Sequence, residues 1–319
     1  MRMTPQINIL QKENVETYDS VMVCNGHYSV PIIPDIPDIN LFSGRILHSH
    51  NYRRPEDFRG ETVIIVGGGA SGTDIMLEVS GEAATVLLSH NHPPLPTLLP
   101  GNVSQVPGLH SVLPDGRLRL VDGSTVEASV ILLATGYSYS FPFLTGECGV
   151  DVSSRRLGPL YKHLVNINHP SMCFVGVPIQ ICPFPQFDLQ ARFFVKILLG
   201  GAKLPGKQEM LEDLRREEDW RKNELKMPEK YFHKMGTLQW IYNKEIAELG
   251  GLTPINNAVE NLYNAVHERR RHCLPYYKQD RFSLTGTESF EGRIYDHETG
   301  QYRDFKSSEQ PSDKPIFIL

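Results

Sequence analysis

The chain has 319 residues, 40% of them hydrophobic and 22% charged, a composition typical of a soluble globular protein with one large core or two smaller ones. Its net charge of −5 leaves no basic surplus to neutralise a phosphate backbone, which argues against nucleic acid as a partner. No apolar stretch reaches the roughly 18 residues of a membrane-spanning helix, so we expect no integral membrane segment. Five scattered cysteines, without a Cys-x-x-Cys pair or a secretory signal, favour the cytoplasm.

An apolar run, Ser20–Cys24, begins close to the start of the chain and predicts a buried β-strand. Because a self-contained fold rarely begins on an interior strand, we expect the chain to be N-terminally truncated. Prolines and aspartates then alternate with isoleucines from Pro31 to Pro37, a composition that excludes both a helix and a strand ladder. This segment is predicted to be an extended connector at a domain boundary.

A strand, a glycine turn, a helix and a second strand are predicted between Thr62 and Asn91. Gly67, Gly69 and Gly72 match G-x-G-x-x-G directly after an apolar strand pattern and before a helical one. Gly67 permits the tight turn, Gly69 leaves room for a pyrophosphate, and Gly72 lets helix and strand pack closely, while the helix N-terminus faces the anion. A tight connection without a ligand is the alternative, but this context favours a nicotinamide dinucleotide.

The predicted second strand ends in polar residues rather than in an acidic one. A Rossmann unit that binds NAD places a carboxylate on the ribose 2′-hydroxyl near this point. Here the chain has Ser89, His90 and Asn91, which tolerate a 2′-phosphate better than a carboxylate would. NADP is therefore favoured over NAD, and His90 is predicted either to contact the phosphate or to be a solvated loop histidine.

Two Asp-Gly steps separate three short runs between Leu109 and Ala134. This spacing predicts a three-stranded meander with Val130–Leu133 as its last strand. Directly after that strand, the small residues Thr135 and Gly136 form a turn where the backbone can pass close to a partner.

The second half of the chain is predicted to be mainly helical. A strand at Met172–Val177 precedes a helical run at Gln186–Leu199, and the segment from Lys207 to His272 is almost wholly helical. The basic cluster Glu268–His272 ends this segment, where it complements the helix dipole, and we expect it to be a solvated face.

Several motifs follow one another in a fixed order. Phe42-x-Gly44-x-x-x-His48-x-x-x-Tyr52 stands just ahead of the glycine turn. The others are Cys24–Tyr28, Ala134–Leu144, Leu160–Lys162 and Phe187–Arg192. In order and spacing these motifs resemble the flavin-containing monooxygenases, the Class B flavoprotein monooxygenases, over essentially the whole chain.

The resemblance implies an α/β flavoprotein fold with two dinucleotide-binding domains, the NADPH Rossmann domain being inserted into the FAD domain. Residues 1–52 would then be the remainder of the FAD domain and a linker, 53–144 the NADPH domain with its meander, and 145–319 the rest of the FAD domain and a helical region. The linker passages would be Phe42–Tyr52 and Ala134–Leu144. The family's first glycine fingerprint, which seats the FAD pyrophosphate, is missing here, so the FAD domain is expected to be incomplete.

The resemblance also implies that NADPH reduces FAD and that O2 is then used to oxygenate the soft nitrogen or sulfur of a small amine or sulfide. No side chain is expected to act as a catalytic acid or base, so the candidate residues bind cofactors. They are Gly67, Gly69, Ser71, Gly72, His90 and Asn91 for NADP; His48, Thr135 and Gly136 at the linkers; and Asn25, Gly26, Gln186, Asp188 and Gln190 beside the flavin.

Asn91 departs from the family pattern, because the resemblance predicts an arginine that grips the 2′-phosphate at this position. Asparagine brings no charge, and charge-assisted hydrogen bonds are roughly twice as strong as neutral ones. The affinity for NADPH, or its selectivity over NADH, is therefore expected to be weaker than the family pattern implies.

Two other functions stay open: a catalytically inactive NADP-binding pseudoenzyme, and an NAD(P)H-dependent reductase that uses the single Rossmann unit without flavin. A homodimer is also open, as is the activity of the truncated form. The spacing of His48 and His50 on an extended run suits a metal, but no acidic or cysteine cluster nearby completes a coordination sphere. His48 is instead predicted to contact a cofactor or to pack at the domain junction.

Overall fold

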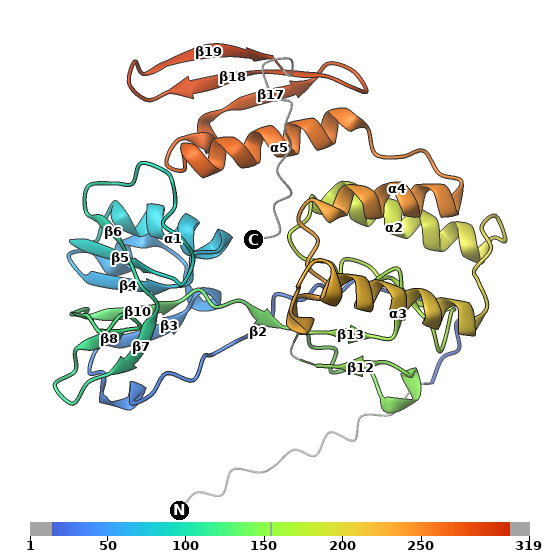
Figure 1. Ribbon diagram of the computed structural model, residues 1–319, viewed down its shortest axis with the longest axis horizontal. Coiled ribbons are helices and arrows are strands. Elements are labelled where there is room, and N and C mark those ends of the chain that lie inside the picture. The colour runs from blue at the N-terminus through green and yellow to red at the C-terminus, as the bar shows by residue number, and fades with distance from the viewer. Residues whose placement is uncertain (1–14, 154, 307–319) are drawn as a thin grey trace, which may run out of the picture.

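The computed structural model describes residues 15–153 and 155–306, which form two α/β parts joined by extended passages (Figure 1). The first part, on the left in Figure 1, is built on a five-stranded sheet, and the second on a four-stranded sheet with three helices. A further helix and a three-stranded sheet lie across the top of both. Within the described residues, no helix combines the length and apolarity needed to cross a bilayer.

The first sheet is entirely parallel and carries the predicted glycine turn. In spatial order its strands are β3 (Arg45–His48), β10 (Val130–Leu133), β4 (Thr62–Val66), β5 (Thr85–Ser89) and β6 (Val103–Val106). Helix α1 (Ala70–Ser80) follows the turn after β4. Alternate side chains of β4 enter different cores, since Val63 packs with α1 while Ile64 packs with the meander on the opposite face. The strand, turn, helix and strand predicted between Thr62 and Asn91 are confirmed.

The meander is present, but its last strand differs from the prediction. It consists of β7 (Leu109–Val112), β8 (Leu118–Leu120) and β9 (Thr125–Val126), paired antiparallel. Val130–Leu133, predicted to close the meander, is instead the strand between β3 and β4 in the parallel sheet. All four of its residues are buried, because both faces of that sheet are covered. The fully apolar run is the signature of such a strand rather than of a half-exposed hairpin strand.

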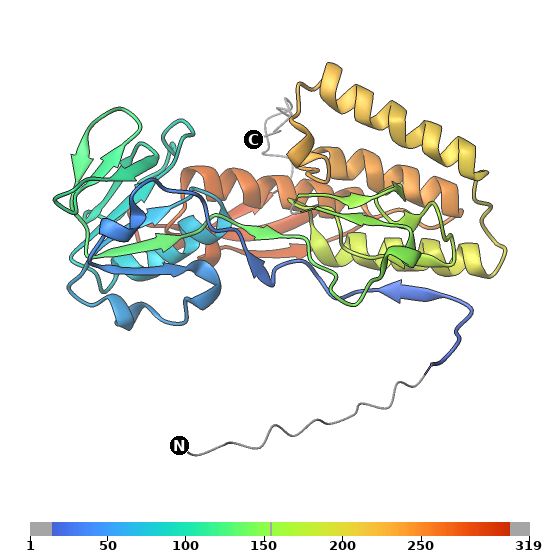
Figure 2. The same cartoon turned by 90° about the horizontal axis from the view of Figure 1, so that it is seen from below.

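Two antiparallel passages connect the parts. β2 (Val30–Pro31) pairs with β11 (Tyr137–Ser138), and the hydroxyl of Thr135 donates a hydrogen bond to the carbonyl of Ile32 at 2.6 Å. Figure 2 shows these passages between the two parts. The predicted first linker and the boundary at residue 53 need correction, since β3 is an edge strand of the first sheet and pairs with β10 over its whole length.

The sheet of the second part has the spatial order β1 (Val21–Val23), β16 (Met172–Phe174), β15 (Val165–Asn166) and β14 (Leu160–Tyr161). The strand predicted at Ser20–Cys24 is confirmed as β1, but its predicted burial is only partly correct. Val23 is 7% exposed while Val21 is 42% exposed. Among the described strands β1 pairs only with β16, and an apolar run does not distinguish an edge strand from a central one.

Helices cover one side of this second sheet and form the largest buried cluster with it. They are α2 (Pro183–Leu198), α3 (Lys207–Asn223) and α4 (Leu238–Gly250). The remaining elements are the hairpin β12 (Asp151–Val152) and β13 (Leu157–Gly158), helix α5 (Asn257–His272), and the sheet of β17 (Arg281–Leu284), β18 (Phe290–Asp296) and β19 (Gln301–Lys306). The predicted helical segment after Lys207 is thus three helices, and a passage with the short 3-10 helix Glu229–Tyr231 separates the first two.

Candidate functional site

The three glycines of the turn between β4 and α1 have different surroundings. Gly67 has a φ of +119°, and a Cβ there would collide with the carbonyl of Ala134. A Cβ on Gly72 would collide with the carbonyl oxygen of Gly67, so Gly72 is required for packing of the turn itself. A Cβ at Gly69 would meet none of the described residues within 4 Å. Gly69 therefore opens onto free space, at the position where the motif predicts a pyrophosphate.

The N-terminus of α1 is electrostatically suited to an anion. The first N–H groups of an α-helix have no intrahelical partner, and here no side chain caps them. The first turn contains no acidic residue, and Ser71 is exposed within it. The helix dipole and the free N–H groups thus face the space in front of Gly69, an arrangement that binds phosphate groups.

His90 and Asn91 lie at the end of β5 beside this turn. The ring of His90 is buried against Gly68, with Nδ1 3.1 Å from the carbonyl of His92 and Nε2 3.1 Å from Oε1 of Gln105. The solvated-loop alternative for His90 is therefore wrong, and both ring nitrogens are already engaged within the chain. Asn91 is exposed, with its side chain against Gly108.

His48, Thr135 and Gly136 meet at the junction of the two parts. His48 ends β3 and is 4% exposed, and its Nδ1 accepts a hydrogen bond from the backbone N–H of His50 at 3.0 Å. Its Nε2 is buried without a hydrogen-bond partner among the described residues, which is what a contact to a bound cofactor would leave in its absence. Burial lowers the pKa of His48, with the Gly136 backbone opposing and His50 adding to this shift, so the ring is neutral.

The histidine pair does not occupy an extended run as predicted. The chain turns into a short 3-10 helix, Ser49–Asn51, immediately after His48, so His50 is not two residues further along the same strand. Both rings instead contact Tyr137 edge-on, with centroid distances of 5.2 Å for His48 and 5.9 Å for His50. The two histidines thus pack around the junction passage.

The residues predicted beside the flavin on α2 do not share one face. Gln186 and Gln190 are fully buried, whereas Asp188 points to solvent and pairs with Arg192 at 2.8 Å. Helical spacing explains this, because residues four apart lie on one face and the residue midway between them does not. Asp188 therefore lies on a different face of α2 from the two glutamines, and its predicted place beside the flavin stays a prediction.

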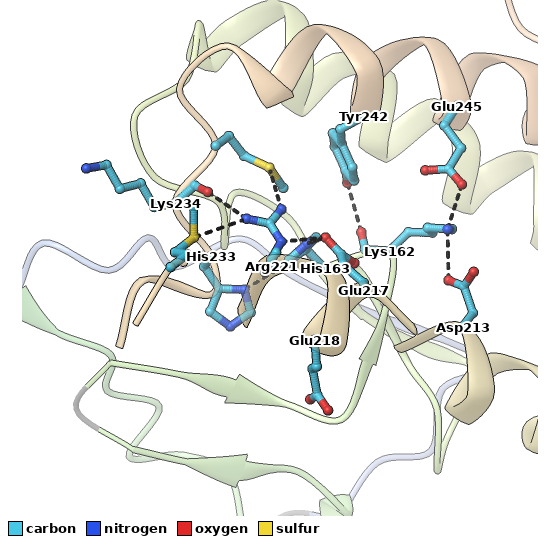
Figure 3. A network of polar contacts seen from close by, with 12 residues as sticks. Lys162, His163, Asp213, Glu217, Glu218, Arg221, His233, Lys234, Tyr242 and Glu245 are labelled. Carbon is cyan, nitrogen blue, oxygen red and sulfur yellow. Dashed lines mark hydrogen bonds and ion pairs between the residues drawn. The ribbon is translucent and has the colours of Figure 1, made fainter. Parts of the chain in front are cut away.

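The two buried glutamines connect α2 to its neighbours. Oε1 of Gln190 accepts from the backbone N–H of Gly176 at 3.0 Å, and its Nε2 donates to the Tyr242 hydroxyl at 2.7 Å. That hydroxyl in turn donates to the carbonyl of Lys162 at 2.9 Å (Figure 3). Gln186 donates to Asn243 at 3.0 Å, while its Oε1 is buried without a partner among the described residues.

Asn25 and Gly26 follow β1 in an exposed loop, where Gly26 has a φ of +74°. The next residue, His27, faces the backbone of Gly176: burial lowers the pKa of this histidine, and the Gly176 contact opposes the shift. Gly176 therefore lies between the loop after β1 and Gln190 of α2. The structure brings Asn25, Gly26 and Gln190 into one region, although the glutamine is committed to internal bonds.

A cavity of about 270 Å³ lies elsewhere, between α3 and α4. The charged side chains lining it are paired with one another. Lys162, for example, contacts Asp213 at 2.8 Å and Glu245 at 2.6 Å (Figure 3). With its charges satisfied and no glycine turn beside it, this cavity has no feature of a dinucleotide site.

The basic cluster at the end of α5 is not only a solvated face, as predicted. Arg270 donates to the Thr73 hydroxyl in the first turn of α1 at 2.8 Å, and Arg269 pairs with the buried carboxylate of Asp280 at 2.8 Å. Only the count of three consecutive arginines hinted at these contacts. The contact joins positions almost 200 residues apart, and no local pattern encodes it.

An open glycine turn at the carboxyl edge of a parallel sheet, joined to a second α/β part, defines a dinucleotide-binding α/β protein. Residues 6–94 and 99–266 match the family model described as flavin-binding monooxygenase-like, and the chain belongs to this family. Its fold is accordingly the two-dinucleotide-binding-domain flavoprotein fold, as the resemblance implied.

Individual relatives agree with the family. The chain is 35% identical over 277 residues to flavin-containing monooxygenase FMO GS-OX-like 7 of Arabidopsis thaliana, an alignment covering 83% of this chain and 58% of the relative. The structure of S-allyl-L-cysteine S-oxygenase from Allium sativum matches with a TM-score of 0.74 and 36% identity, covering 79% of this chain and 58% of that one. Tmm from Pelagibacter sp. strain HTCC7211 matches with a TM-score of 0.72 and 26% identity, covering 90% and 62%. The chain thus spans less than two thirds of these relatives.

Proposed function

We propose that the chain binds NADP at the turn between β4 and α1 and acts within a flavin-dependent monooxygenase that oxygenates the soft nitrogen or sulfur of a small molecule. The observation that carries the proposal is the open position at Gly69 in front of an uncapped helix N-terminus. Sulfur is the favoured acceptor, because the similar protein from Allium sativum is an S-oxygenase.

The chain's own residues bind and orient the cofactors in this proposal. The N–H groups at the start of α1 hold the pyrophosphate, Gly69 allows its close approach, and the neutral ring of His48 directs its unpaired Nε2 into the junction. Bound FAD would take up the reducing equivalents of NADPH and activate O2. The residues fit the flavin only in part, since the described chain has one strand, glycine turn and helix unit, and this unit is assigned to NADP.

Calorimetric titration of the purified chain with NADP⁺, followed by NADPH oxidation assays with a thioether and a tertiary amine in the presence of FAD, tests the proposal. NADP⁺ binding with substrate-dependent oxidation supports it. Binding without turnover by a chain that holds stoichiometric FAD would identify the inactive NADP-binding protein instead. Flavin-independent NADPH oxidation would identify a reductase, and absence of NADP⁺ binding would contradict the assignment of the turn.

A further inference from the structure

The end of β5 lacks the cation that a 2′-phosphate requires. From Thr85 to Asn102 the chain contains no lysine or arginine. Asn91 is uncharged, and both ring nitrogens of His90 are engaged by the His92 carbonyl and Gln105. If this strand end alone selected the dinucleotide, a 2′-phosphate would gain no arginine fork here, although such forks are the favoured partners of phosphate in proteins.

Helix α5 brings an arginine to the first turn of α1, from a position far along the chain. Nη2 of Arg270 donates to the Thr73 hydroxyl at 2.8 Å and lies 3.4 Å from the carbonyl of Ala70, both in the first turn of α1. The Thr73 hydroxyl itself donates to the carbonyl of Gly69 at 3.1 Å. Arg270 is thus one hydroxyl away from the glycine that faces the predicted pyrophosphate.

The end of α5 contacts both α1 and the loop that follows β5, the two segments next to the strand end where a βαβ unit reads the ribose. On one side Arg270 contacts α1. On the other, the backbone N–H of Leu274 donates to the hydroxyl of Thr97, in the loop that follows β5, at 3.0 Å. Leu274 is 3% exposed and belongs to the same buried cluster as α1, so this position of α5 is fixed by packing.

Arg269, the preceding residue of α5, secures this position through other partners. Its guanidinium bonds both carboxylate oxygens of Asp280, at 2.8 and 3.2 Å, and the carbonyl of Tyr295 at 3.1 Å. The carboxylate of Asp280 is almost fully buried. This anchoring holds the backbone beside Arg270, so its side chain reaches α1 from a rigid base.

The guanidinium of Arg270 keeps N–H donors without a partner among the described residues, and its positive charge is not fully neutralised. Within the described residues all of its hydrogen bonds are made by Nη2, although a guanidinium has five N–H donors. Its side chain is 25% exposed. The carboxylate of Asp74 lies 3.8 Å from Arg270 and 3.1 Å from Nζ of Lys278, so two cations share one carboxylate and the cluster keeps a net positive charge.

We propose that Arg270, supplied by α5, is the residue that selects a dinucleotide bearing a 2′-phosphate, in place of an arginine after β5. The proposal rests on the proposed NADP site, and its chemistry is recognition of a ribose phosphate monoester by the unused donors of the guanidinium. A role in holding the pyrophosphate or the turn itself would affect NADP and NAD alike, and this difference makes the proposal testable.

The test compares calorimetric titrations of NADP⁺ and NAD⁺, and of 2′,5′-ADP and 5′-AMP, against the purified full-length chain. Arg270→Ala should lower the affinity for NADP⁺ and for 2′,5′-ADP by about tenfold or more, because one charge-assisted hydrogen bond contributes about this much to binding. NAD⁺ and 5′-AMP should stay within about twofold. Arg293→Ala is the matched control, since it removes an arginine that is 60% exposed in β18 and should change neither ligand pair.

Asp74→Asn gives a second test that loss of folding cannot imitate. Removing the carboxylate that neutralises Arg270 and Lys278 should raise the affinity for NADP⁺ about threefold and leave the affinity for NAD⁺ unchanged. Equal weakening of both dinucleotides by Arg270→Ala, or no weakening, would overturn the proposal. If the wild-type chain bound NAD⁺ but showed no preference for NADP⁺, only this inference would fail. If it bound neither, the proposed function would fail as well.

Discussion

Gly69 and Gly72 lie three residues apart in the same turn, yet the structure gives them opposite tolerances. A side chain at Gly69 enters open space, while one at Gly72 meets the carbonyl oxygen of Gly67. The backbone at Gly69 is in an ordinary extended conformation, with φ −75° and ψ −172°, so other residues can adopt it. Binding and folding requirements are therefore separable within one motif.

We predict that Gly69→Val weakens NADP⁺ binding by at least about tenfold, because its branched side chain fills the approach of the pyrophosphate. The unfolding free energy should change by less than about 1 kcal/mol, the usual scale of a helix N-cap substitution. Gly72→Ala, the comparison variant, should lower the free energy of unfolding by about 1–3 kcal/mol, because the added methyl group overpacks the turn. Urea unfolding and NADP⁺ titration of both variants measure this, and unchanged affinity in Gly69→Val would refute the assignment of the turn.

A second group of residues, under α3, makes stability depend on pH. Burial would raise the pKa of Glu217, but the charges and hydrogen bonds of His163 and Arg221 outweigh it and hold this pKa far below its usual range. Nδ1 of His163 lies 2.9 Å from Nδ1 of His233 (Figure 3). Burial, together with electrostatic interactions with His163, Arg156 and Arg221, lowers the pKa of His233 well below its ordinary value.

Both shifts act in the same direction on stability. A histidine with a lowered pKa stays neutral when folded, so stability is lost as pH falls below the ordinary value of 6.5. The lowered pKa of Glu217 stabilises the fold above the ordinary value of 4.5, and this contribution is lost at lower pH. We predict a loss for His233 of at most about 1.4 kcal/mol per pH unit between pH 6.5 and 5.5.

Urea unfolding of the wild type and of His233→Gln at pH 7.5, 6.5 and 5.5 checks this prediction. The variant should lose less stability than the wild type across the interval, whatever its stability at pH 7.5. Parallel pH profiles would show that His233 is already protonated in the folded chain.

The sequence predicts the surroundings of the turn glycines well, since they follow from local geometry that the motif specifies. It does not predict the contacts of His90, because Gln105, whose Oε1 lies 3.1 Å from its Nε2, is 15 residues away on β6. The exposure of Asp188 could have been predicted. It lies two residues from both Gln186 and Gln190, and helical spacing alone places it on another face.

At the scale of elements, burial separates the correct predictions from the wrong ones. The run Val130–Leu133 was correctly predicted as a strand, but its place in the sheet depends on β3 and β4, which are distant in sequence. β3 itself was predicted as part of a linker from the family resemblance, although its sequence mixes charged and apolar residues. Such a pattern suits an edge strand, whose one unpaired side faces solvent, and edge strands carry a weak sequence signal.

Helix α2 supplies a prediction at the scale of elements, since Gln190 is the residue that connects it to both the Gly176 loop and α4. Gln190→Leu should lower the unfolding free energy by about 1–3 kcal/mol, because the buried N–H of Gly176 is left without a partner. Asp188→Ala, two residues away on the exposed face, should change it by less than about 0.5 kcal/mol. Thermal and urea unfolding of both variants measure these two changes in unfolding free energy. Equal changes would contradict the assignment of Gln190 as the buried link between α2 and its neighbours.

At the scale of the whole molecule, the chain connects its two parts more extensively than the two passages require. β2 pairs with β11 at the junction. In addition Leu274, two residues after α5, packs into the core of the first part beside α1. Figure 1 shows α5 and the β17–β19 sheet lying over both parts. The family resemblance predicted two domains, but not this third connection, because the family's motifs end before the residues that make it.

The number of glycine turns gives the last prediction, which concerns the flavin. Two dinucleotides need two helix N-termini that face a pyrophosphate, and the described residues contain one, at α1. The loop at Asn25 and the unpaired Nε2 of His48 remain as predicted flavin contacts, and neither would neutralise the charge of a pyrophosphate. We therefore expect the chain to bind NADP⁺ while binding FAD weakly or not at all.

The visible spectrum of the purified chain measures this directly, before and after equilibration with excess FAD and removal of the unbound flavin. NADP⁺ titration of the same sample is the control for a folded dinucleotide site. The expected outcome is a colourless protein that binds NADP⁺, because His48 and the Asn25 loop contribute polar contacts without an anion cradle. A yellow protein with stoichiometric flavin would contradict the prediction, and it would mean that the FAD pyrophosphate is held by backbone groups outside any glycine turn.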